Sequence, residues 1–185
     1  MFADRKKLTV ERKDNMGQLN REALAHYLDT TFKKVLASAE FEVIGEDIEE
    51  MSVELKKTIL GKTKTTDNGY EPSISADPFY ADPDSKLYPH IRDIALDQLK
   101  GDACKTLMLE VIVEDTSAEN HLAYVQEVLV KPQSYGGDTA GVNIPFNISF
   151  DGDRTKGYVT AESLKTGNPK FTAGALPASV NSLAD

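Results

Sequence analysis

Apolar and polar side chains alternate strictly between residues 142 and 151. The apolar positions are Val142, Ile144, Phe146, Ile148 and Phe150. Because successive side chains of a strand point to opposite faces, this period of two predicts a half-buried strand. Asp151 and Gly152 follow it and favour the backbone angles of a tight turn, so we expect a hairpin here and a last strand near residues 157–160. Pro145 has no amide hydrogen to donate, which places it at a bulge or a strand edge.

Shorter alternating runs predict further strands. Residues 41–43 and 51–55 alternate apolar with mainly acidic positions, and a break at residues 45–47 separates them. Residues 107–113 and 123–131 form a second pair, joined by a polar turn that makes them natural hairpin partners. The pattern therefore predicts six or seven strands, mostly antiparallel.

Two other segments repeat their apolar side chains at helical spacing. The first is residues 21–36, which follow Asn20, a residue type that caps helices. Its apolar positions are Leu24, Leu28, Phe32 and Val35 or Leu36. The second is residues 89–100, where Pro89 can open a helix and Gly101 can end it. We expect the second helix to cover one sheet.

A long connection and two polar ends lie outside these elements. Residues 61–89 are rich in Thr, Asp, Gly and Pro, so only part of this segment can be regular strand. The segment also carries five large side chains: Tyr70, Phe79, Tyr80, Leu87 and Tyr88. Their presence favours an extended loop or hairpin that packs against another surface over a disordered segment. The first 14 residues are charged and unpatterned, and residues 166–185 have few large side chains, so both predict arms that order on contact with a partner.

The elements together predict a mainly β fold. We expect an antiparallel β-sandwich or half-barrel with one flanking α-helix, an N-terminal helix, and extended loop and tail arms. The predicted units are an N-terminal arm with its helix (1–38), a sheet domain with the long loop 61–89 and the helix 89–100 (39–165), and a flexible C-terminal tail (166–185).

Length and charge narrow the class of protein. The chain has 185 residues, no long apolar run and a formal net charge of −9. These features predict a soluble single domain without a secretory signal or membrane span, made and used without export. An acidic surface argues against gripping nucleic acid, but it does not argue against a surface that nucleic acid slides past.

The sequence offers few candidate catalytic or metal-binding residues. His26, His90 and His121 lie on different predicted elements, and no Cys, Asp or Glu stands near any of them at metal-ligand spacing. Cys104 is the only cysteine, so it cannot form an internal disulfide and is expected to be a buried structural thiol. No nucleophile elbow or desolvated carboxylate pair is apparent. We therefore expect neither an enzyme nor a bound cofactor or metal.

Residues 41–159 resemble the major tail tube proteins of long-tailed, non-contractile (siphovirus-type) bacteriophages. Four segments carry the resemblance, in the expected order. They are FEVIGEDIEEMSVELK, the long TILGKTKTTDNGYEPSISADPFYADPDSKLYPHIRDIALDQLKG, CKTLMLEVIVED and VQEVLVKPQSYGGDTAGVNIPFNISFDGDRTKG. These motifs are structural, and the helix expected at residues 21–36 departs from the family pattern.

The resemblance implies a virion protein synthesised in the host bacterial cytoplasm. Such subunits form six-fold rings that stack into a hollow tube, with tape measure, tail terminator and baseplate proteins as partners and with no membrane involved. DNA would pass through the tube without specific binding, and an acidic inner face would repel its phosphates. The candidates for that face are Glu50, Ser52, Glu54, Thr106, Glu110 and Glu114. The candidates for contacts between stacked rings are Tyr70, Phe79, Tyr80 and Tyr88.

The sequence leaves three alternative interpretations open. A solvated outer face would give the same acidic pattern as a lumen. An inner tube protein of a contractile, phage-tail-like particle would have a related fold, and a sheath around the tube would distinguish it. A ligand-binding β-sandwich that holds carbohydrate with the aromatic loop is the third alternative, although the absence of Trp weakens it.

Overall fold

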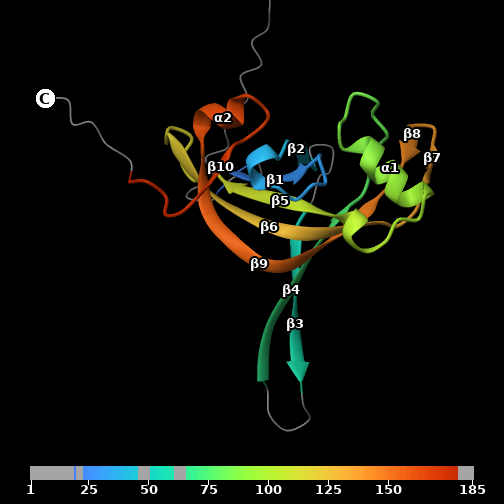
Figure 1. Ribbon diagram of the computed structural model, residues 1–185, viewed down its shortest axis with the longest axis horizontal. Helices are drawn as coiled ribbons and strands as arrows, with labels where there is room; N and C mark the ends of the chain where they lie inside the picture. Colours follow the sequence, from blue (N-terminus) through green and yellow to red (C-terminus); the bar gives the residue numbers. More distant parts are fainter. Residues whose placement is uncertain (1–18, 20–22, 46–50, 61–65, 179–185) are drawn as a thin grey trace, which may run out of the picture.

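The computed structural model describes residues 19, 23–45, 51–60 and 66–178, with residues 56–60 and 66–69 described by their backbone. Within these ranges the protein is mainly β, and one antiparallel sheet of eight strands curls into a half-barrel flanked by helices (Figure 1). Its strands are β1 (Leu24–Asp29), β2 (Phe41–Ile44), β3 (Val53–Leu60), β4 (Thr66–Ala76), β5 (Lys105–Ile112), β6 (Asn120–Pro132), β9 (Phe146–Thr160) and β10 (Phe171–Ala173). The other elements are the ribbon β7 (Gly136–Asp138) and β8 (Gly141–Asn143), the helices α1 (Tyr88–Leu96) and α2 (Ala161–Lys165), and the 3-10 turns Leu36–Ser38 and Gly101–Cys104.

The strands follow the order β2-β1-β5-β6-β9-β4-β3, and β10 adds to β9. The predicted hairpin of β5 and β6 is confirmed, with Leu109 opposite Val125. β3 and β4 form a second hairpin, which projects well beyond the rest of the molecule (Figure 1). The order begins at β2 and ends at β3, so within the described ranges each of these strands has a partner strand on one side.

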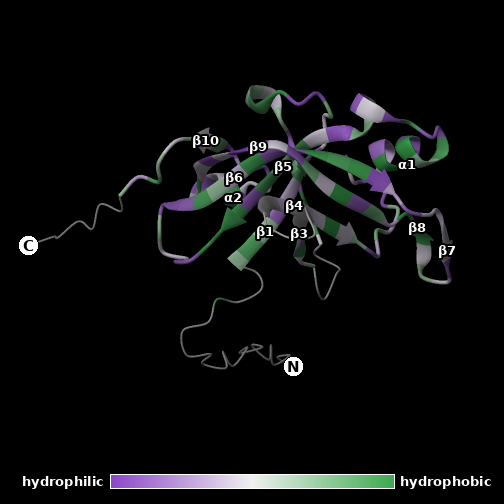
Figure 2. Ribbon diagram, turned by 90° about the horizontal axis from the view of Figure 1, so that it is seen from below, coloured by the Kyte–Doolittle hydropathy of each residue, from purple (hydrophilic) through white to green (hydrophobic). Residues whose placement is uncertain are grey.

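The sheet buries apolar side chains on both of its faces, and hydrophobic and hydrophilic residues alternate along its strands (Figure 2). One cluster includes Ile148 and Met108 and packs against Ile91 of α1. The other includes Leu109 and packs against Leu164 of α2. The predicted flanking helix is therefore present as α1, with Pro89 in its first turn, but it ends at Leu96 instead of continuing to residue 100, and Gln98 has a positive φ of 52°.

The expected helix at residues 21–36 is wrong, because residues 24–29 form strand β1. Leu24 and Leu28 lie four residues apart, and an even spacing puts both side chains on one face of a strand as well as on one face of a helix. Pairing with β5 decides between the two, since Leu28 lies opposite Met108. Phe32 and Lys34 then adopt positive φ angles of 52° and 57°, which stop a helix from forming there.

The expected hairpin at Asp151 and Gly152 is also wrong. β9 runs through both residues without reversing, and its pairing with β6 shifts register there. Gly152 has the predicted positive φ, 70°, but it uses this angle in a β-bulge. The predicted last strand near residues 157–160 is therefore the second half of β9. The strand predicted at residues 142–151 is broken at Pro145, which lies between β8 and β9 outside any ladder, so β9 begins only at Phe146.

Segments predicted as a loop and a tail contribute strands. β4 occupies residues 66–76 of the predicted loop 61–89 and pairs with both β3 and β9. In the predicted tail 166–185, β10 pairs with β9. Residues 1–18 and 20–22 of the predicted N-terminal arm (1–38) lie outside the described residues.

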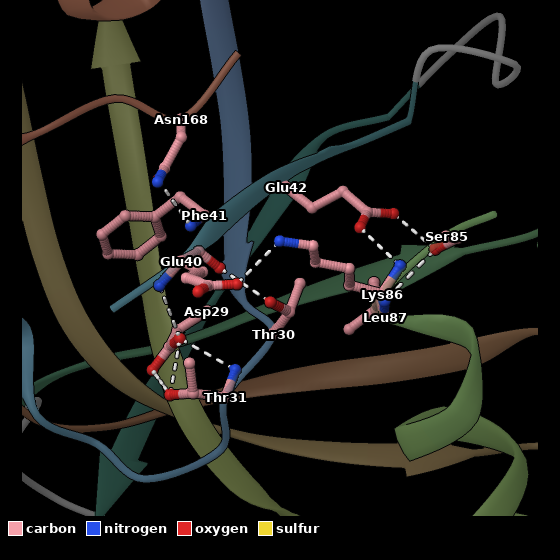
Figure 3. A network of polar contacts seen from close by, with 10 residues as sticks. All are labelled: Asp29, Thr30, Thr31, Glu40, Phe41, Glu42, Ser85, Lys86, Leu87 and Asn168. Carbon is pink, nitrogen blue, oxygen red and sulfur yellow. Dashed lines mark hydrogen bonds and ion pairs between the residues drawn. The ribbon is translucent and has the colours of Figure 1, made fainter. Parts of the chain in front are cut away.

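A polar network fastens the corner between β1 and β2 to two distant loops (Figure 3). The buried Asp29 carboxylate accepts hydrogen bonds from the Thr31 and Glu40 amides, at 3.0 and 3.1 Å. The Phe41 amide donates to Asn168 Oδ1 at 3.1 Å, and the Glu42 carboxylate accepts from the Lys86 amide at 3.0 Å. These bonds tie the loop before α1 and the loop after α2 to β2.

Candidate functional site

One face of the sheet carries a patch of small polar side chains over β3, β4 and β9. We define the polar face as Ser52, Glu54, Ser73, Ser75, Asn147 and Ser149. The register places Glu54 opposite Ser73 and Ser73 opposite Ser149, so these side chains form one row across three strands. Together with Ile74 they line a shallow hollow of about 460 Å³.

The polar face is the direct result of strand alternation. Val53, Ile74 and Ile148 occupy the intervening positions and point into the core. The polar residues between them therefore point the other way. Ser52 and Glu54, two of the predicted lumen residues, lie on this face and are exposed.

Charged side chains continue the same row over β5 and β6, and they are paired. Ser149 lies opposite Leu129, which lies opposite Lys105. Lys105 Nζ is 2.9 Å from Asp151 Oδ2 and 3.5 Å from Glu127 Oε1. The hydrogen bond and the charge of Asp151 raise the pKa of Lys105, and Lys105 lowers the pKa of Asp151 in the same way. The cation at this end of the row is therefore neutralised by carboxylates.

Two predicted lumen residues lie on the opposite face and are buried. Thr106 donates a hydrogen bond to the Asp29 carbonyl oxygen at 2.7 Å, and Glu110 is 6 % exposed. The lumen assignment of both is therefore wrong in this fold. The sequence indicated this burial. Met108 and Ile112 alternate with Thr106 and Glu110 at even positions of the same strand, so the face that these residues share is also partly apolar.

Glu110 belongs to a polar cluster that sequence reasoning missed, in which His26, Glu110 and Gln126 are buried and Arg154 is exposed. Its carboxylate contacts Arg154 Nη2 and lies 3.2 Å from His26 Nε2, although neither ring nitrogen of His26 has a hydrogen bond of good geometry. Arg154 Nε also donates to Gln126 Oε1 at 3.3 Å, and Gln126 Nε2 donates to the Gly152 carbonyl oxygen at 2.9 Å. The cluster links β1 and β5 to the bulge of β9. Its members are far apart in the sequence, so no local motif predicts it.

The two remaining lumen candidates do not join the polar face. Glu114 is exposed in the turn after β5, where it lines a separate hollow of about 540 Å³ with Asp115, Glu119 and His121. Burial lowers the pKa of His121, and the charge of Asp115 opposes part of this effect. Glu50 lies outside the described residues.

The four aromatic residues predicted for ring stacking do not form one surface. Tyr70 is exposed on the projecting hairpin, and Tyr80 is exposed next to β8. Phe79 packs edge to face on Phe146 with ring centroids 5.1 Å apart, and Tyr88 packs against the same core cluster from α1. Phe79 and Tyr88 are therefore largely core residues, and only the other two are presented for contact.

The described ranges hold no group of three or more His, Cys, Asp or Glu side chains arranged to bind a metal ion. No helix in the same ranges is long and apolar enough to cross a membrane. Cys104 is buried, as predicted, and its thiol lies 3.2 Å from the Leu99 carbonyl oxygen.

No protein-family profile matches the chain, and a comparison with proteins of curated function gives no match.

Proposed function

We propose that this protein is a structural subunit of a bacteriophage tail tube, which polymerises as stacked rings around a channel for DNA. The observation that carries the proposal is the open, curled sheet with its polar face over β3, β4 and β9. Such a sheet can continue into a neighbouring copy through its outer strands, which would close the exposed edges. The resemblance of residues 41–159 to tail tube proteins supports the same function.

The chemistry of the polar face suits a channel that conducts DNA. Five of its six members are hydroxyl or amide side chains, the sixth is the carboxylate of Glu54, and none of the six is a cation. Phosphate binding depends mainly on Lys and Arg, so this face would let a nucleic acid pass without holding it. Of the predicted lumen residues, we retain Ser52 and Glu54.

The projecting hairpin also supports a polymer. A two-stranded hairpin that stands alone is marginally stable in water, so partners in an assembly would stabilise it. Leu55 and Tyr70 on this hairpin are 57 % and 58 % exposed. A subunit that works alone has no evident use for these exposed apolar groups.

Concentrating the purified protein and imaging it by negative-stain electron microscopy, with light scattering in parallel, tests this function. We expect hollow rings or tubes of uniform width. Particles that stay monomeric, even when short preformed tail tubes are added as seeds, would contradict the proposal. A sheath around tubes in the native particle would instead assign the chain to a contractile machine.

A further inference from the structure

A lysine and the only cysteine of the chain lie in contact at one end of the sheet. Cys104 ends the 3-10 turn Gly101–Cys104, directly before β5, and Lys131 lies near the end of β6. Lys131 Nζ is 3.6 Å from Cys104 Sγ, and each of these atoms is 3.2 Å from the Leu99 carbonyl oxygen. Two side chains that are nucleophiles in their deprotonated forms are therefore placed against each other.

The ladder of β5 and β6 sets this placement. Lys105 lies opposite Leu129, so Cys104 and Lys131 both stand just beyond this pair, at the same end of the ladder. The Cys104 thiol and the Lys131 amino group both donate to the Leu99 carbonyl oxygen, and the amino group also donates to the sulfur. A shared acceptor holds the nitrogen and the sulfur together.

The amino group of Lys131 is not engaged by a carboxylate. Among the described residues, the ion pairs of lysine involve Lys34, Lys86 and Lys105, and none includes Lys131. The partners of Lys131 are the neutral carbonyl oxygen and the thiol. No acidic side chain therefore draws the amino group away from the sulfur.

A small hollow adjoins the pair. Its volume is about 250 Å³, and Leu99, Lys100 and Lys131 are among the residues that line it. The Cys104 side chain itself is buried. Hydrogen peroxide is little larger than water, which needs about 30 Å³, so the hollow has room for this oxidant next to the buried thiol.

We propose that Cys104 and Lys131 form a reversible covalent cross-link, a sulfenamide bond between Sγ and Nζ, when the protein meets hydrogen peroxide. Nζ and Sγ are already close to the separation of about 3–3.5 Å from which bonds form readily. The link would tie the 3-10 turn after α1 to β6. This inference does not depend on the proposed tube.

The reaction has two balanced steps. Hydrogen peroxide first oxidises the Cys104 thiol to a sulfenic acid by two electrons and is itself reduced to water. The Lys131 ammonium group then releases one proton to solvent, and its nitrogen lone pair attacks the sulfur. The bond from sulfur to the hydroxyl group breaks, and the hydroxyl leaves as water with a second proton from the nitrogen. Two equivalents of an added thiol reverse the link, giving back the cysteine and the lysine together with a disulfide of the reagent.

Mass spectrometry of the full chain after treatment with hydrogen peroxide tests the cross-link. We expect a product about 2 Da lighter than the untreated chain, because the two steps together remove two hydrogen atoms. Trypsin should then leave peptide 101–105 joined to peptide 106–154, and dithiothreitol should separate them. The link should also raise the midpoint of thermal unfolding by about 5 °C or more, since it closes a loop in the unfolded chain.

Three variants show whether this pair is responsible. Cys104→Ser and Lys131→Arg should both prevent the link, but Lys131→Arg should keep the sulfenic acid, about 16 Da heavier and trapped by dimedone. Lys100→Arg changes another lysine of the same hollow and should link normally. A native chain in which Cys104 retains oxygen and the two peptides stay separate would overturn the proposal. Loss of 2 Da in Lys131→Arg would also overturn it, because another nitrogen would then hold the sulfur.

Discussion

Glu110 of β5 and Glu54 of β3 are both acidic residues of the sheet, but they differ in burial. Glu110 is buried beside His26 and contacts the exposed Arg154, whereas Glu54 is exposed on the polar face. Glu110→Lys removes the carboxylate partner of Arg154 and puts an unpaired cation at a buried position, so the free energy of unfolding should fall by about 3 kcal/mol or more. Glu54→Lys should change it by no more than about 0.5 kcal/mol. Urea denaturation of both variants measures the contrast, and equal losses would contradict the burial of Glu110.

His121 should make stability depend on pH. Its pKa in the folded protein is lowered from the ordinary 6.5, mainly by burial, so the unfolded chain binds a proton more readily. Stability is therefore complete above pH 6.5 and is lost as the pH falls towards the folded pKa. Urea denaturation at about pH 7.5 and about pH 5 should show a larger loss for the native chain than for His121→Gln, because other groups titrate equally in both. Identical losses would show that His121 does not contribute.

At the scale of the element, Gly157 decides whether β10 can join the sheet. A Cβ at Gly157 would overlap the Thr172 carbonyl oxygen and the Phe171 ring, whereas a Cβ at Gly136 would meet nothing within 4 Å. Gly157→Ala should therefore lower the free energy of unfolding by about 1–3 kcal/mol and expose the amides of β10 to hydrogen exchange. Gly136→Ala serves as the control and should leave both quantities unchanged. Protection of β10 in Gly157→Ala would contradict its pairing with β9.

The hairpin of β3 and β4 can be shortened without touching the core. A deletion of residues 71–84 would remove the second half of β4, including the buried Ile74, and would unfold the sheet. Replacing residues 57–70 with Asn-Gly instead joins Lys56 to Glu71, which already face each other, through a two-residue turn. We expect this variant to keep its thermal unfolding transition, measured by circular dichroism, and to form no tubes by electron microscopy. Normal tubes from it would exclude the hairpin from assembly.

At the scale of the whole molecule, the polar face would line the channel of the proposed tube and influence how DNA moves through it. Glu54→Lys exchanges the single carboxylate of this face for a cation in every subunit, and cations attract phosphate. Phage carrying this change should assemble tails of normal length but eject DNA more slowly and form fewer plaques. Glu119→Lys, at an exposed position away from the polar face, is the matched control. Unchanged ejection would remove the polar face from the lumen.

The sequence by itself determined the elements whose side chains alternate without ambiguity. The hairpin of β5 and β6, residues 146–150 of β9 and the apolar stripe of α1 follow from local periodicity, because a repeat of 2 or of 3.6 residues fixes which residues share a face. Alternation likewise placed the side chains of Ser52 and Glu54 on the face of the strand opposite to that of Val53. These assignments required no knowledge of the rest of the chain.

The tertiary structure decided the conformation of segments whose periodicity suits two kinds of structure. Leu24 and Leu28 suit a helix or a strand, and only pairing with β5 makes them a strand. Gly152 supplies a positive φ that serves a turn or a bulge, and the ladder with β6 selects the bulge. Alternation also cannot tell whether the second face of a strand meets water. Thr106 and Glu110 are buried because the curled sheet encloses that face, which depends on contacts between residues far apart in the sequence.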